Sequence, residues 1–225
     1  MIKIFILIVV SLVPISLVYF NLTLPDVHGR FWFTVFVIFV MIERMWETFY
    51  TSKEKEVRKY HGDWTLMLTS VMYFFTGLVV IFDFFYSNRV INYLITFLGL
   101  TIFILAGLLR YWSVKTLGDQ WAIHAVGESK IMNKHTLIKH GPYKYSRHPI
   151  YLGIMLELIG IALTANAFYA LIPIFFINIP LYIQRALFEE RTSSKERFGE
   201  EYLLYKKEVP FMIPWHFIIS KKKGG

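Results

Sequence analysis

The residues best suited to chemistry lie in one short block, Gly141 to Gly153, between two apolar runs. Two prolines and two glycines limit regular helix there, so the block is expected to be a loop. It brings hydrogen-bonding and ring-stacking groups together: Tyr143, Tyr145, Arg147, His148 and Tyr151. Two interpretations are open. The block holds a ligand, or it is an interfacial anchor with tyrosines at headgroup depth and basic residues facing anionic lipid.

A second polar group ends a later apolar run. Arg185 and Glu189 are one helical turn apart, and Glu190 follows directly. An exposed pair at this spacing contributes only about 0.3–0.5 kcal/mol, but charges at the end of an apolar helix are costly unless they face water or a partner. The pair therefore indicates a polar cavity. A guanidinium matches a carboxylate, and a nearby carboxylate can accept ribose hydroxyls or balance a cationic ligand.

Arg110 is the third candidate, at the end of another apolar run. It is a possible catalytic residue together with Arg185 and Glu189, or an arginine whose side chain snorkels to lipid phosphates. The histidines match no compact metal-ligand spacing, and a proline follows His148 directly, so we predict no metal site. The sequence contains 0 cysteines, which excludes thiolate metal sites and disulfides.

The composition indicates an integral membrane protein. The chain has 225 residues, of which 56% are hydrophobic, well above the share typical of soluble domains. A net charge of +8 is compatible with nucleic-acid binding. The basic residues, however, fall in short segments between apolar runs, where membrane orientation accounts for them. We therefore predict no nucleic-acid partner.

The apolar runs predict an all-α, polytopic fold with about six transmembrane helices. The expected spans are Ile2–Phe20, Phe31–Tyr50, Trp64–Tyr86, Val90–Trp112, Ile150–Ala162 and Phe168–Phe188. A tight turn at Thr164 to Ala167 joins the last two into a hairpin, and Pro173 and Pro180 are expected to kink its second arm.

Lysine and arginine predict the orientation in the membrane. They are frequent in residues 51–63, in the long loop 113–149 and in the tail after Glu189. Six spans place all three segments on one side, which predicts a cytoplasmic cofactor loop and cytoplasmic N- and C-termini. Residues 1–112 would form four N-terminal spans, and residues 113–225 a core of loop, hairpin 150–188 and tail. Asp83, near one end of the third span, is expected within reach of water.

The motifs together resemble the isoprenylcysteine carboxyl methyltransferase family. The resemblance is carried by Gly141-Pro142-Tyr143, Arg147-His148-Pro149, Tyr151, Gly153, Arg185, Glu189-Glu190, Phe198 to Tyr202 and Tyr205. Arg110, Trp112, Leu117-Gly118 and Trp121 are similar to the preceding segment of the family. The likeness runs from about Leu108 to Pro214, whereas the first three spans match only as hydrophobic helices.

This resemblance implies S-adenosyl-L-methionine as methyl donor. The positions implied to line the cofactor site are His135, Thr136, Leu137, Ile138, Tyr143, His148, Pro149, Ile150, Tyr151 and Glu189. Arg185 would orient the acceptor, a lipid-like or prenylated molecule at the membrane surface that is methylated on its carboxylate. A carboxylate is ionised at neutral pH and needs no general base, whereas a phenol or amine would need Glu189 or His148.

Three other functions stay open at this point. Phospholipid or other lipid O- or N-methylation belongs to the same reaction class. NADPH-dependent sterol reductases carry a similar Arg-His-Pro-x-Tyr segment, but the chain has no evident basic site for a 2′-phosphate. A non-catalytic membrane scaffold or transporter subunit would bind no cofactor. The sequence gives no indication of an oligomeric state.

Overall fold

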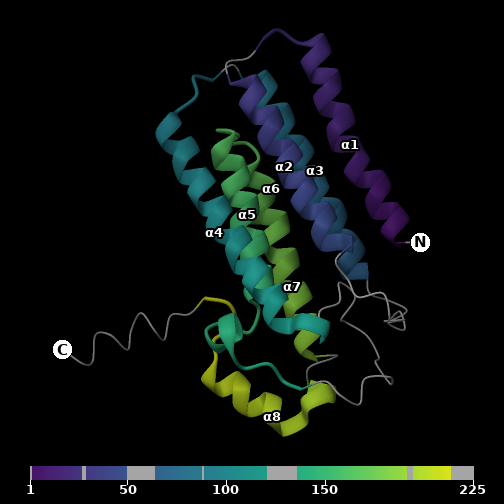
Figure 1. Cartoon of the computed structure of the whole chain (residues 1–225), viewed down its shortest axis with the longest axis vertical. Coiled ribbons are helices and arrows are strands. Elements are labelled where there is room, and N and C mark those ends of the chain that lie inside the picture. The colour runs from purple at the N-terminus through teal and green to yellow at the C-terminus, as the bar shows by residue number, and fades with distance from the viewer. Residues whose placement is uncertain are drawn as a thin grey trace, which may run out of the picture.

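The computed structural model describes residues 2–26, 29–49, 64–87, 89–120, 136–191 and 195–213, and within these ranges it contains helices and no strand. The helices are α1 (Ile2–Thr23), α2 (Arg30–Phe49), α3 (Trp64–Tyr86), α4 (Tyr93–Leu117), α5 (Pro149–Thr164), α6 (Leu171–Pro173), α7 (Ile179–Glu189) and α8 (Lys195–Glu208). Figure 1 shows the long helices side by side, with α8 lying across one end of the bundle. The all-α prediction is confirmed for the described part of the chain.

Three helical stretches are long and apolar enough to cross a membrane: Met67–Tyr86, Tyr93–Leu117 and Leu171–Glu189. Large apolar side chains on them, such as Leu94 and Phe176, are exposed, as expected where lipid is the solvent. Helix α5 and residues Ser11–Thr23 of α1 are shorter apolar helices. The chain is thus a membrane protein, while the six-span topology stays a prediction.

Close packing of α4 against α5 forms the base on which the site is built. A Cβ atom added to Gly160 would lie 2.7 Å from the backbone nitrogen of Phe103, and one added to Gly99 would lie 2.3 Å from that of Thr164. These two glycines therefore let the backbones approach, as small residues do between membrane helices. The block Gly141 to Gly153, which leads into α5, is consequently held at the end of α4.

The hairpin predicted at Thr164 to Ala167 is confirmed. Helix α5 ends at Thr164, and the chain reverses through Asn166, which adopts a positive φ of 53°. Irregular helix occurs in the second arm, where the two prolines were expected to disturb it. A π-helical segment, Ile174–Asn178, separates α6 from α7, and the Asn178 side chain donates to the carbonyl oxygen of Pro173.

The expectation that Asp83 lies within reach of water is wrong. Asp83 is buried, with 3% of its surface exposed. Its carboxylate accepts from the backbone nitrogen of Tyr169 at 2.8 Å and pairs with Arg89 at 3.1 Å. Arg89 also donates to the carbonyl oxygen of Asn166 and lies over the rings of Phe168 and Tyr169. These partners compensate the desolvated charge and tie the α3–α4 connection to the hairpin turn.

Candidate active site

The block Gly141 to Gly153 folds into a tight turn that leads directly into α5. Gly141 has a φ of 60°, and a 3₁₀ turn follows over Gly141–Lys144 with Pro142 in its first positions. Pro149 occupies the first turn of α5, where its missing N–H costs nothing. Tyr143, Ser146 and His148 are buried, whereas Tyr145 is exposed. Three of these side chains therefore face the protein interior, which favours the ligand interpretation over an interfacial anchor.

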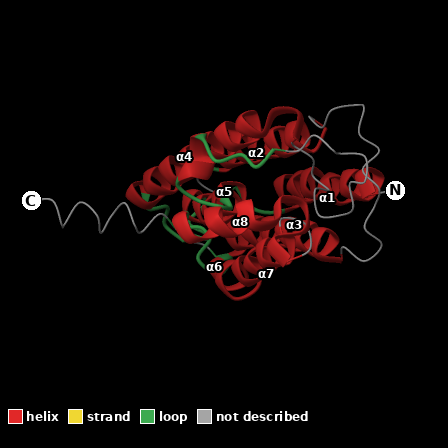
Figure 2. Cartoon of the chain, turned by 90° about the horizontal axis from the view of Figure 1, so that it is seen from below, coloured by secondary structure: helices red, strands yellow, loops and turns green. Residues whose placement is uncertain are grey.

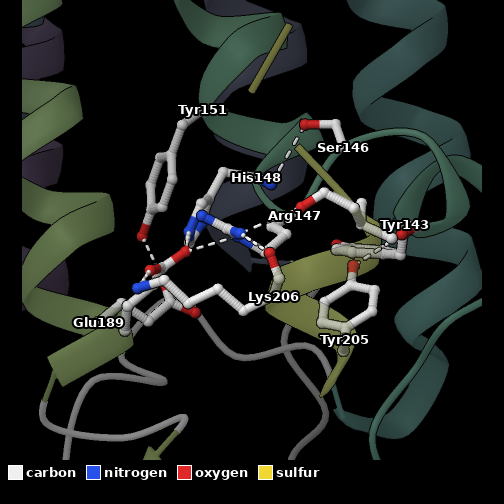
Figure 3. Close-up of polar contacts among 10 residues, drawn as sticks. Tyr143, Ser146, Arg147, His148, Tyr151, Glu189, Tyr205 and Lys206 are labelled. Carbon is white, nitrogen blue, oxygen red and sulfur yellow. Dashed lines mark hydrogen bonds and ion pairs between the residues drawn. The ribbon is translucent and has the colours of Figure 1, made fainter. Parts of the chain in front are cut away.

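Tyr151, Arg185 and Glu189 come together as the sequence predicted. The Tyr151 hydroxyl donates to the Glu189 carboxylate at 2.8 Å (Figure 3). Arg185 is buried on α7 and donates through Nη1 to the hydroxyl of Thr65 on α3 at 2.9 Å. Glu189 thus contacts a side chain of α5, and Arg185 contacts a side chain of α3. The two residues are therefore not an isolated i, i+4 pair on the surface of α7.

Glu190 is the centre of an ionic network at this end of the described bundle. Its carboxylate accepts from Arg147 Nε at 2.8 Å and from Lys206 Nζ at 2.8 Å, and His148 Nε2 lies 3.0 Å away. Burial by itself raises the pKa of Glu190, but the hydrogen bonds from His148 and Lys206 and the charges of His148 and Arg147 outweigh it and lower the pKa to about 2. Glu190 is therefore ionised at neutral pH.

The same network joins the block to α8. Arg147 donates to the carbonyl oxygens of Lys206 and Val209 at 2.8 and 3.0 Å, and its own backbone nitrogen donates to Pro210. The Phe211 ring packs edge-on against His148, with 4.9 Å between ring centroids. Figure 2, which looks onto this end of the bundle, shows α8 lying over the helix ends. The charges of the network therefore hold α8 against the site.

Tyr143 carries a buried polar atom suited to a ligand. Its carbonyl oxygen accepts from the Tyr205 hydroxyl at 2.6 Å, but its own hydroxyl is buried without a hydrogen-bond partner among the described residues. Burial and then the charge of Glu189 raise the pKa of this phenol well above its usual value, so the hydroxyl stays protonated and lies within the field of that carboxylate. An unsatisfied buried hydroxyl costs about 1–3 kcal/mol, which a polar ligand beside Glu189 would recover.

The remaining predicted cofactor positions differ in burial. Pro149 and Ile150 are buried at the start of α5, and Thr136 is exposed. Leu137 is half-buried and packs against a small apolar cluster of Tyr202, Tyr205 and Val209, which connects residues 136–138 to α8. His135 lies outside the described residues.

Arg110 lies in a separate group of charges inside the bundle. It is 1% exposed, which excludes snorkelling to lipid phosphates. It donates to Glu157 on α5 and to Glu43 on α2, and Tyr73 on α3 donates to Glu157 at 2.6 Å. This cluster joins four helices, so the contacts of Arg110 are those of a structural residue; a catalytic role for it stays a prediction.

Sequence reasoning missed three residues around the site and the bundle interior: Thr65, Glu157 and Lys206. Glu157 was hidden within an apolar run. The available signal was its charge, because a lone carboxylate in such a run requires a buried partner, and Arg110 in the preceding run has the opposite charge. No comparable signal marks Thr65 or Lys206, which reach the site through the fold.

Comparison with known proteins connects this geometry to a family. Residues 97–194 match one family model. This range includes the block Gly141 to Gly153, α5 and α7, but neither Thr65 of α3 nor α8. The family is the isoprenylcysteine carboxyl methyltransferase family. The resemblance noted in the sequence is thereby confirmed for this segment.

Three curated relatives are protein-S-isoprenylcysteine O-methyltransferases. That of Saccharomyces cerevisiae is 32% identical over 130 residues, covering 58% of this chain and 53% of the relative. The protein of Rattus norvegicus is 35% identical over 132 residues, covering 56% and 43%. The protein of Homo sapiens is 34% identical over 123 residues, covering 52% and 40%. The chain thus spans about half the length of the relatives that it matches.

Proposed function

We propose that this protein is an S-adenosylmethionine-dependent methyltransferase that methylates the carboxylate of a lipid-like or prenylated acceptor at the membrane surface. The family match and the names of the relatives support the reaction class. The observation that carries the proposal is the grouping of Tyr143, Tyr151, Arg185 and Glu189 at one end of an apolar bundle.

The residues present fit the proposed methyl donor. S-adenosylmethionine supplies an activated methyl group on a positively charged sulfonium. Glu189 offers a carboxylate that balances a cationic ligand, and the unpartnered Tyr143 hydroxyl offers a hydrogen bond. His148 and Tyr151 supply ring faces beside them, and Pro149 and Ile150 supply apolar surface. Residues Thr136 to Ile138 would close the remaining edge, and the sequence predicts His135 as a further cofactor contact.

Arg185 is assigned to the acceptor. Its guanidinium matches a carboxylate in shape and charge, and an ionised carboxylate requires alignment rather than a general base. Arg185 lies on α7, near the end of the apolar stretch Leu171–Glu189. An acceptor can therefore keep its apolar tail in the bilayer while its carboxylate reaches Arg185. Burial of the site excludes water from the transfer step.

We also propose the topology expected from the sequence, with about six spans and both termini in the cytoplasm. The side-by-side arrangement of the long helices supports it, and so does the gathering of Lys139, Lys144, Arg147 and Lys206 at the α8 end. Residues 1–112 would supply the N-terminal spans, and residues 113–225 would supply the methyltransferase core.

The test uses the detergent-purified chain, methyl-labelled S-adenosylmethionine and a farnesylated N-acetylcysteine as acceptor. We expect label in a base-labile ester. Arg185→Ala should lower transfer by about 100-fold while cofactor affinity changes less than about threefold, because the lost group aligns only the acceptor. Arg30→Ala, at the opposite end of the bundle, is the matched control and should leave both quantities unchanged.

Two results would overturn this function. One is binding of NADPH without binding of S-adenosylmethionine, which would point to a reductase. The other is transfer of label to phospholipid with none to the carboxylate acceptor, which would move the chain to lipid methylation. An equal loss of cofactor affinity in Arg185→Ala would assign Arg185 to the donor instead.

A further inference from the structure

We propose that Thr65 on α3 is a positioning residue that aims the Arg185 guanidinium at the acceptor carboxylate; this rests on the proposed function. Arg185 Nη1 donates to the Thr65 hydroxyl at 2.9 Å. The two residues are 120 positions apart in the chain, and 3% of Arg185 and 4% of Thr65 are exposed. The contact is therefore a long-range one, shielded from water.

Thr65 is well suited to hold a long side chain in one direction. It is β-branched and lies in the first turn of α3, so its side chain has few rotamers. Its carbonyl oxygen accepts from the Thr69 hydroxyl at 2.8 Å, one turn further along the helix. An arginine side chain carries about 2 kcal/mol of rotamer entropy, and a bond to a rigid partner reduces the number of directions in which the guanidinium can point.

The chemical type of the partner also fits a substrate-binding arginine. A hydroxyl takes up one N–H without bringing a negative charge, so the contact orients the guanidinium without neutralising it. A carboxylate at position 65 would instead compete with the carboxylate of the acceptor. Thr65 thus contributes alignment without adding a charge of its own.

Thr65 lies outside the segment 97–194 that matches the family model. The matched segment supplies Arg185, Glu189 and Tyr151, whereas the direction of Arg185 is set from α3. The consequence is a division of labour in which an N-terminal helix, recognisable in sequence only by its hydrophobicity, determines how the acceptor is presented to the cofactor.

The test compares three single variants with the same farnesylated acceptor and methyl-labelled S-adenosylmethionine. Thr65→Val keeps the shape and removes the hydrogen bond. We expect it to lower kcat/KM for the acceptor by about 10-fold, mostly through KM, with cofactor affinity unchanged. Thr65→Ser, which restores the hydroxyl, should return to within about threefold of the parent protein. Thr101→Val, on α4, removes a hydroxyl that donates to the carbonyl oxygen of Phe97; it is the matched control and should retain parental kcat/KM.

A double variant separates orientation from general destabilisation. If Thr65 acts through Arg185, then Thr65→Val should cause no further loss in an Arg185→Ala background. Retained cofactor affinity shows that each variant is folded, and Thr65→Ala, which adds no bulk, gives a second reading of the same loss.

The possible outcomes separate the positioning role of Thr65 from the proposed methyltransferase function on which it rests. Parental kcat/KM in Thr65→Val, failure of Thr65→Ser to restore activity, or an equal loss in Thr101→Val would overturn the positioning role while leaving methyl transfer established. Absence of carboxylate methylation in the parent protein would overturn both.

Discussion

The two ends of the helical bundle each contain a buried carboxylate, but the partners of these carboxylates differ in kind. At the hairpin end, Asp83 is bound by Arg89 and by the backbone of Tyr169, both within turns between membrane helices. At the α8 end, Glu190 is bound by Arg147, His148 and Lys206, which come from a loop, a helix start and a surface helix.

We interpret the Asp83 cluster as one that stabilises the fold, and the Glu190 end as part of the proposed ligand site. The Asp83 cluster fastens two turns to each other, and the Asn166 amide in the same region bonds to Asn92 and Thr96. The α8 end instead contains a buried hydroxyl, on Tyr143, that has no hydrogen-bond partner among the described residues, and it is covered by α8, which Lys206 ties to Glu190. Stability should therefore depend most on one end and ligand binding on the other.

Asp83→Ala should have the largest effect on folding. It leaves Arg89 and the Tyr169 N–H without their carboxylate, which costs about 3 kcal/mol in the free energy of unfolding. The measurement is denaturant unfolding in detergent, with Asp83→Asn as the variant that keeps size and one acceptor oxygen. S-adenosylmethionine affinity of the folded protein should be unchanged; a loss of affinity here would contradict the separation of the two ends.

Glu190→Gln should have an intermediate effect on stability, about 1–2 kcal/mol, and should weaken S-adenosylmethionine about 10-fold because α8 and residues 136–138 lose their anchor. The control is Glu201→Gln, whose pair with Lys139 is exposed and should contribute less than about 0.5 kcal/mol.

The same variant has a pH signature. The pKa of Glu190 is lowered from 4.5 to about 2 in the folded protein. Its stabilising contribution is therefore complete above pH 4.5 and is lost as the pH falls towards 2. Unfolding measured across this range should be less steeply pH-dependent in Glu190→Gln, and an identical slope in both proteins would show that Glu190 is not the group responsible.

Tyr143→Phe should have the smallest effect on stability and the clearest effect on the ligand. Removing a buried, unpartnered hydroxyl should leave the free energy of unfolding unchanged or raise it by up to about 1 kcal/mol. S-adenosylmethionine binding, followed by calorimetry, should weaken about fivefold. The matched control is the exposed Tyr145→Phe, for which we expect parental affinity; destabilisation in Tyr143→Phe would assign its hydroxyl to the fold.

The parts of the fold that could be predicted are those set by neighbours in the chain. Apolar run lengths predicted the helices, and small and polar residues predicted the hairpin turn at Thr164 to Ala167. The spacing of Arg185 and Glu189 drew attention to the end of α7, and the roles of these two residues stay predictions. The contacts of Glu190 with the loop could not be predicted, because helical spacing does not indicate which carboxylate meets a loop.

The parts that could not be predicted depend on contacts between distant segments. Tyr73 and Glu157 are 84 residues apart, and Thr65 and Arg185 are 120 residues apart. A threonine at a helix start carries no mark of such a partner. The charge of a glutamate within an apolar run indicates that it needs a buried partner, but does not indicate that Tyr73 is one. Asp83 was expected near water for the same reason, since Arg89 and the Tyr169 backbone become its neighbours only in the folded chain.

The π-helical segment Ile174–Asn178 determines the direction in which the site residues of α7 point. A π-helix has more residues per turn than an α-helix, so this segment sets the rotation of α7 about its axis. If the same residues wound as α-helix, α7 would turn by about 100° and advance by about 1.5 Å, carrying Arg185 away from Thr65 and Glu189 away from Tyr151. The directions of the Arg185 and Glu189 side chains are thus set two to three helical turns earlier in the chain, within the apolar stretch Leu171–Glu189.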